Sequence, residues 1–266
     1  MNNFKGVFQN DLSSQSSYSY QNQRGVKTQF NKHQVSSLTR AMMVTGFGFL
    51  ATFLIGILIE YLIDYSIKIG SITNINVLFS ITAVGLIISF GLSIIWSFRV
   101  YKASTGFATT TIIVYCIANG VGFGSLFYLV EYWEIMMVFG VLGLIFLFTF
   151  GISKIISSKV VLSLMKIAFV ATIVYLVFVL IVGLLSGFGL LSFFSFGYSY
   201  LIIIAVSGLL SIFYLVYELW IIQNLDKFYL DNELTKKLSI FMGFQILMNL
   251  INLLWVFLRV FLLSRK

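Results

Sequence analysis

A run of 51 uncharged residues, 167–217, constrains this chain more than any other feature. A helix of about 20 apolar residues crosses a bilayer, so the run is long enough for two crossings and a turn between them. The segment SGFGLLSFFSFGYS, residues 186–199, places three glycines near the middle of the run. Glycine adopts turn conformations at low cost, so this segment is the predicted turn. The run therefore predicts two membrane-spanning helices, at about 163–185 and 199–222.

The composition places the whole chain among integral membrane proteins. Hydrophobic residues make up 59% of the 266 residues and charged residues 10%, whereas soluble domains carry about 25% charged residues. The net charge is +8. In a membrane protein the basic residues mainly reflect which loops lie on the cytoplasmic side, so we expect no nucleic-acid partner. One cysteine and one histidine provide neither an internal disulfide nor a zinc site. We expect no metal site and no cofactor.

The other uncharged runs predict five further spans, at about 41–63, 75–98, 106–130, 134–153 and 238–263. The fold class is therefore an all-α integral membrane protein with seven transmembrane helices in the domain 41–266; six helices with a re-entrant segment are the alternative. Residues 1–40 are rich in Asn, Gln and Ser, which predicts a disordered cytoplasmic tail. The first apolar run is too long for a signal-peptide core, so it is interpreted as a retained span.

Lysine and arginine predict the orientation, because they gather on the cytoplasmic side of membrane proteins. With the N-terminus inside, three basic residues fall outside: Lys68, Arg265 and Lys266. Thirteen fall inside: Lys5, Arg24, Lys27, Lys32, Arg40, Arg99, Lys102, Lys154, Lys159, Lys166, Lys227, Lys236 and Lys237. This asymmetry predicts a multi-pass protein of the cell membrane with a cytoplasmic N-terminus and an outer C-terminus.

Two polar stripes run along the last two predicted spans. Residues spaced three or four apart share one face of a helix. The first stripe consists of Ser207, Ser211, Tyr214 and Glu218, and the second of Gln245, Asn249, Asn252 and Arg259. A charge in the hydrocarbon costs about 2.5–3.5 kcal/mol on insertion scales, so such residues usually face the bundle interior or water. The stripes therefore predict a shared polar seam between the two helices.

Purely structural interpretations remain open for several of these residues. Gln245 and Asn252 are suited to hydrogen bonding between helices, and Arg259 is close enough to the outer boundary to snorkel. Gly120 and Gly124 form a Gly-x-x-x-Gly pair, which favours close helix packing. For Glu218 we favour a functional or paired role, with Arg99 or Lys102 at the end of the second span as partner.

The ionisable residues do not match the motifs of membrane enzymes or retinal proteins. No lysine lies between residues 238 and 265, where a retinal Schiff base would need one. The single histidine lies in the tail, and the aspartates Asp64, Asp226 and Asp231 lie in predicted loops. We therefore expect no enzymatic activity.

The C-terminal third resembles the bacterial branch of the Bax inhibitor-1 family. The resemblance rests on SIFYLVYELWIIQNL (211–225) and QILMNLINLLWVFLRVF (245–261), and the segment GFATTTIIVYCIANGVGFGSLFY (106–128) is similar to the family's third helix. Tyr217, Glu218 and Leu219 correspond to its Tyr-Asp-Leu-like element. The family's last span contains an Ile-Asn-Leu element and then an arginine followed by an aromatic residue near its end. Ile251, Asn252 and Leu253 correspond to the first of these, and Arg259 to the second.

This resemblance, over residues 40–266, implies seven helices with the last one central and a pH-sensitive calcium leak gated by two carboxylates. Glu218 corresponds to the first carboxylate, whereas Asn249 occupies the position of the second, and Arg99 lies near the basic latch. The departure at Asn249 leaves two functions open. One is a leak channel or transporter for calcium or another cation. The other is a non-transporting regulator of a membrane protease or of stress survival, with a membrane protein as partner.

Overall fold

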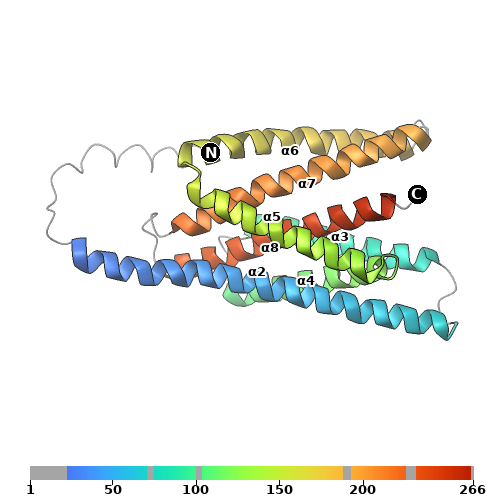
Figure 1. Cartoon of the computed structure of the whole chain (residues 1–266), viewed down its shortest axis with the longest axis horizontal. Helices are drawn as coiled ribbons and strands as arrows, with labels where there is room; N and C mark the ends of the chain where they lie inside the picture. Colours follow the sequence, from blue (N-terminus) through green and yellow to red (C-terminus); the bar gives the residue numbers. More distant parts are fainter. Residues whose placement is uncertain (1–22, 71–74, 100–103, 188–192, 226–231, 265–266) are drawn as a thin grey trace.

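The computed structural model describes residues 23–70, 75–99, 104–187, 193–225 and 232–264, and within them the protein is helical with no strand. The seven helices alternate in direction along one bundle, so the start of the first and the end of the last lie at opposite ends (Figure 1). This arrangement confirms the predicted all-α class. The helices are α2 (Gln23–Lys68), α3 (Ile75–Arg99), α4 (Thr105–Phe127), α5 (Tyr132–Ile155), α6 (Ser158–Gly187), α7 (Phe193–Asn224) and α8 (Asn232–Ser264).

The helices coincide closely with the predicted spans. In the described part of the chain, six are long and apolar enough to cross a membrane, and α3 contributes a shorter apolar segment, Ser80–Trp96. The uncharged run 167–217 divides between α6 and α7, as the glycine-containing segment predicts. The protein is therefore a multi-pass membrane protein.

The first helix is longer than the predicted span. α2 begins at Gln23, although its apolar segment begins only at Ser37. Residues 23–40 of the predicted tail thus form the start of α2, and residues 1–22 lie outside the described residues. The chain contains no proline that would interrupt this helix.

The last helix is central to the bundle. α8 packs against α2, α4, α5 and α7, and Trp96 of α3 contacts Phe241 and Phe244 of α8. Most of the largest fully buried side chains in the described residues belong to α8: Phe244, Ile246, Leu247, Ile251, Leu253, Leu254 and Leu258. The prediction of a central last helix is thereby confirmed. α6 lies at the periphery, mainly against α7 (Figure 1).

Small residues allow α2 and α4 to approach closely. A Cβ atom at Gly120 would lie 2.6 Å from the Cβ of Ile55, and one at Gly124 would lie 2.5 Å from the Cβ of Ile59. Both positions also face a backbone carbonyl of α2 at 2.9 Å. Helices in a bilayer associate through close packing of this kind, because lipid provides little hydrophobic driving force. This is the contact that the Gly-x-x-x-Gly spacing favours.

Local signals mark two helix ends. α2 ends at Lys68 and is followed by Gly70, whose φ of 74° lies in the left-handed region that favours glycine. α4 begins after Ser104, whose side chain accepts a hydrogen bond from the amide of Phe107.

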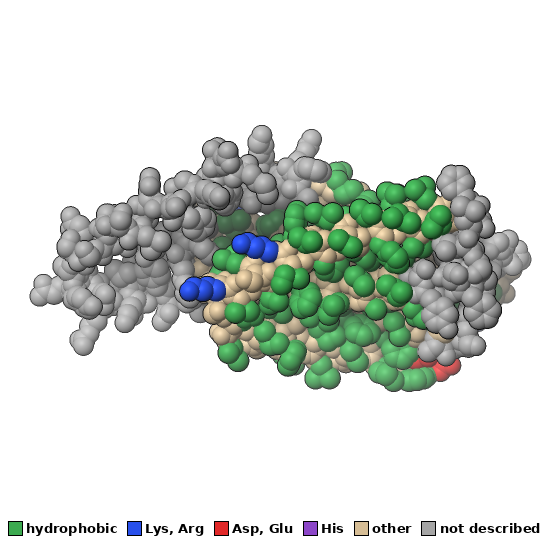
Figure 2. Space-filling view, turned by 90° about the horizontal axis from the view of Figure 1, so that it is seen from above, with side chains coloured by type: hydrophobic (Ala, Val, Ile, Leu, Met, Phe, Trp, Pro, Cys, Tyr) green, Lys and Arg blue, Asp and Glu red, His purple; other side chains and the backbone are tan. Residues whose placement is uncertain are grey.

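Charged side chains divide between the two ends of the bundle. The face in Figure 2 is covered by hydrophobic side chains, with Lys or Arg toward the end where α2 begins and Asp or Glu at the other. The alternating helices place Arg40, Lys154, Lys159, Lys166, Lys236 and Lys237 toward the first end. Four acidic residues lie toward the second end: Glu60, Asp64, Glu131 and Glu134. The apolar middle is the surface that faces lipid.

Candidate functional site

The candidate site is the contact between α7 and α8. The two helices are antiparallel neighbours (Figure 1). Glu218 lies six residues before the end of α7 at Asn224, which places it about 9 Å from that end at a rise of about 1.5 Å per residue. Its side chain is 5% exposed. A carboxylate is therefore buried within a membrane-spanning helix.

Asn249 of α8 faces this carboxylate. Its Nδ2 donates to Oε1 of Glu218 at 2.9 Å and to Oε2 at 2.8 Å. Among the residues that the structure describes, Asn249 is the only hydrogen-bond partner of Glu218, and no Lys or Arg forms an ion pair with it. The two positions that the family resemblance aligns with a carboxylate pair thus lie in direct contact.

A second polar contact lies about one helical turn from Asn249 along α8 and about two turns from Glu218 along α7. Nδ2 of Asn252 donates to Oγ of Ser211 at 2.5 Å and lies 3.3 Å from Oγ of Ser207. The Ser211 hydroxyl in turn donates to the carbonyl of Ser207 at 2.9 Å. We define the polar seam as Ser207, Ser211, Glu218, Asn249 and Asn252. Its hydrogen bonds join α7 to α8 within the apolar bundle.

Three members of the predicted stripes lie outside the polar seam: Tyr214, Gln245 and, at the far end of α8, Arg259. The hydroxyl of Tyr214 lies 2.8 Å from Oγ1 of Thr172 on α6, so this residue joins α7 to the peripheral helix. Gln245 is partly buried, and no described residue forms a hydrogen bond with its side chain. A stripe on one helix face shows which residues point the same way, whereas a long side chain such as tyrosine can still reach a different neighbour.

The predicted ion pair of Glu218 with the second span stays a prediction. Arg99 is the last residue of α3, but its side chain lies outside the described ones, and Lys102 lies outside the described residues altogether. Arg259 lies at the other end of α8, and its guanidinium carbon lies 5.5 Å from the centroid of the Trp255 ring. It is thus held by an aromatic side chain, apart from the polar seam.

Sequence reasoning missed a further polar contact, between α4 and α8. The indole Nε1 of Trp255 donates to Oδ1 of Asn119 at 3.2 Å, and Nδ2 of Asn119 donates to the carbonyl of Tyr115 at 2.9 Å. Both side chains are buried. The sequence signal for this contact was the presence of two polar side chains within predicted spans: Asn119 in the third span, and Trp255 one turn before Arg259 in the last.

The polar seam can accept a positive charge but does not form a complete metal site. Calcium takes six to eight oxygen ligands, with carboxylates among them. In the described part of the chain, no three His, Cys, Asp or Glu side chains are grouped so as to hold a metal ion. One carboxylate with amide and hydroxyl oxygens nearby is suited to brief contact with a passing cation or to proton binding.

Comparison with known proteins identifies no relative of this chain: no family model matches it, and no curated protein or solved structure is significantly similar.

Proposed function

We propose that the protein is a cation leak channel or transporter of the cell membrane, with Glu218 as the charged residue of its pathway along the polar seam. The observation that carries the proposal is the carboxylate of Glu218, buried in a membrane-spanning helix with a single amide as its described hydrogen-bond partner. Ionisable residues at such positions typically mark ion or proton pathways.

The chemistry of the polar seam supports a cation. The side-chain amide nitrogen of Asn249 donates to both carboxylate oxygens, but a neutral amide does not balance a negative charge. A cation that enters from the nearer end of the bundle would balance it, and the carbonyl and hydroxyl oxygens of Asn252 and Ser211 would offer further weak ligands. Calcium is the ion that the resemblance to the Bax inhibitor-1 family favours.

Removing the charge of Glu218 provides the test. In vesicles with purified protein, Glu218→Gln should lower calcium flux at least about tenfold. A tenfold loss corresponds to only about 1.4 kcal/mol of lost interaction between the carboxylate and the cation. Unit charges 4 Å apart interact by about 4 kcal/mol at an effective dielectric constant of 20. The glutamine keeps an oxygen that accepts from Asn249, so the helix contact survives.

Glu134→Gln is the matched control, because Glu134 is equally buried but lies in the first turn of α5 at the opposite end of the bundle. Its flux should equal that of the wild type. Equal losses of calcium flux in both variants would mean that the loss in Glu218→Gln does not arise from the polar seam. If the wild type carries no cation, the non-transporting regulator becomes the better account.

We further propose that the end of the bundle where α2 begins is cytoplasmic, since most of the described basic residues lie toward it, with Lys68 and Arg259 toward the other end. With Cys116 replaced by serine, single cysteines at Ser157, Ser192 and Ser264 report the two sides. An impermeant thiol reagent on intact cells should label Ser192→Cys and Ser264→Cys but spare Ser157→Cys, which follows α5. If only Ser157→Cys were labelled, the orientation would be the opposite of the one proposed.

A further inference from the structure

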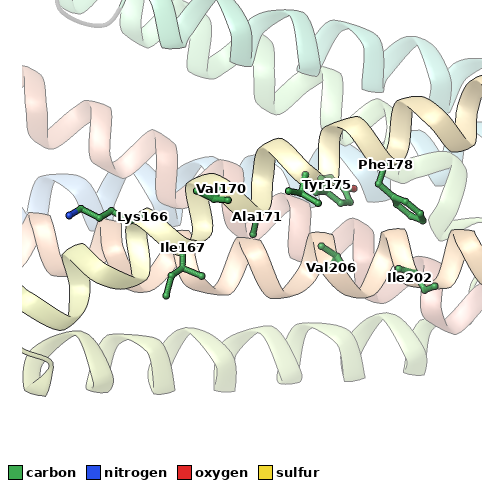
Figure 3. Close-up of a pocket in the computed structure, with 9 residues that line it drawn as sticks. Lys166, Ile167, Val170, Ala171, Tyr175, Phe178, Ile202 and Val206 are labelled. Atoms are coloured by element: carbon green, nitrogen blue, oxygen red, sulfur yellow. The ribbon is translucent and has the colours of Figure 1, made fainter.

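An apolar groove lies between α6 and α7 on the lipid-facing side of the bundle. It has a volume of about 670 Å³, within the range of roughly 300–1,000 Å³ found for small-molecule sites. Val170, Ala171 and Phe178 of α6 line it together with Ile202 and Val206 of α7 (Figure 3). Val170 is 61% exposed and Ile202 52% exposed, so the groove is open to the surrounding bilayer. Its occupant can therefore enter sideways from the membrane.

One charged residue lies at the end of this groove. Lys166 is the only Lys, Arg, Asp or Glu among the described lining residues, and its amine points away from the apolar side chains (Figure 3). It is exposed, and no described acidic residue forms an ion pair with it. Lysine side chains commonly direct their charge to the headgroup level while their stems stay in apolar surroundings. An anion at that level would complement Lys166.

The length of the groove fits one leaflet. Phe178 lies twelve positions after Lys166 along the α6 lining, which corresponds to about 18 Å at a rise of about 1.5 Å per residue. Half of a hydrocarbon core of about 30 Å is about 15 Å. An acyl chain that starts at headgroup level beside Lys166 would therefore lie along the groove to about the bilayer centre.

We propose that this groove binds one acyl chain of an anionic phospholipid whose phosphate pairs with Lys166. The second chain would lie against the exposed face of α6, where Phe169 and Ile173 are 54% and 49% exposed. The lipid would stabilise the position of α6, which packs mainly against α7 and is tied to it by the contact between Thr172 and Tyr214. This inference is independent of cation transport.

Native mass spectrometry of the protein in neutral detergent tests the proposal. An equimolar mixture of phosphatidylglycerol and phosphatidylcholine should give one preferred adduct, with phosphatidylglycerol. Lys166→Gln should lower that preference about fivefold, which corresponds to about 1 kcal/mol for one basic side chain at an anionic lipid surface, and Lys166→Arg should retain it. Lys159→Gln removes the same charge from α6 outside the groove and should leave the preference unchanged.

Filling the groove tests the acyl-chain site separately. Ala171→Phe should lower the adducts of both phospholipids, whereas Val177→Phe should not, because Val177 is exposed on α6 but does not line the groove. Equal adducts of the two phospholipids with wild-type protein, or equal effects of Lys166→Gln and Lys159→Gln, would overturn the headgroup contact. Displacement of phosphatidylglycerol by an equimolar fatty acid would overturn the assignment to a phospholipid.

Discussion

Gly124→Ala is expected to destabilise the folded protein by about 3 kcal/mol, the upper part of the range for overpacked positions. The new Cβ would lie 2.5 Å from the Cβ of Ile59 and 2.9 Å from the carbonyl oxygen of Gly56. The first of these atoms is attached directly to the backbone and the second belongs to it, so a side-chain rotation cannot relieve the contact. α2 and α4 must separate, and their interface must repack. The midpoint of unfolding in detergent, by heat or by a denaturing detergent, measures the loss.

Gly140→Ala provides the matched control for this substitution. Gly140 lies in the middle of α5, and its Cβ would meet no described atom within 4 Å. Alanine is favoured over glycine within a helix by up to about 1 kcal/mol, so this variant should be as stable as the wild type or slightly more stable. Equal losses from both substitutions would mean that glycine flexibility, and not close packing of α2 on α4, determines the stability.

The helices could be predicted because a single physical quantity determines them. A bilayer requires about 20 apolar residues per crossing, and the uncharged runs of this chain are separated by few charges. The predicted span 75–98 thus corresponds to α3 at Ile75–Arg99, and the run 167–217 divides between α6 and α7. The start of α2 was not predicted, because no bilayer constraint applies to the helix before Ser37.

The partners of polar side chains could be predicted only in part. The spacing along α7 and α8 placed Glu218 and Asn249 on facing stripes, and the structure brings them into contact. Tyr214 belongs to the same stripe by spacing, yet its partner is Thr172. The contact of Asn119 with Trp255 joins two residues that are 136 positions apart in the sequence. The sequence indicated α7 and α8 as neighbours through their matching stripes, but it offered no such indication for helices far apart in the chain, so pairs of this kind require the fold.

Asn249→Asp is expected to change how calcium flux depends on pH. In the wild type the polar seam contains one carboxylate, so protonation of Glu218 would turn the flux off in a single step. Two carboxylates in contact cannot both ionise at low cost, and they release their protons in two separate steps that belong to the pair. The variant should therefore show two steps over a wider pH range than the wild type.

Flux into vesicles at closely spaced pH values, with equal pH on both sides, measures these profiles. Glu218→Gln should show no step, because its remaining flux does not depend on a carboxylate in the polar seam. The double variant with Glu218→Gln and Asn249→Asp moves the single carboxylate from α7 to α8 and should regain one step. A wild-type profile with two steps, or an Asn249→Asp profile identical to that of the wild type, would contradict the role of this contact. The direct contact between the two side chains, 2.8–2.9 Å in the wild type, is what makes strong coupling the expected result, since interaction between charges weakens with distance.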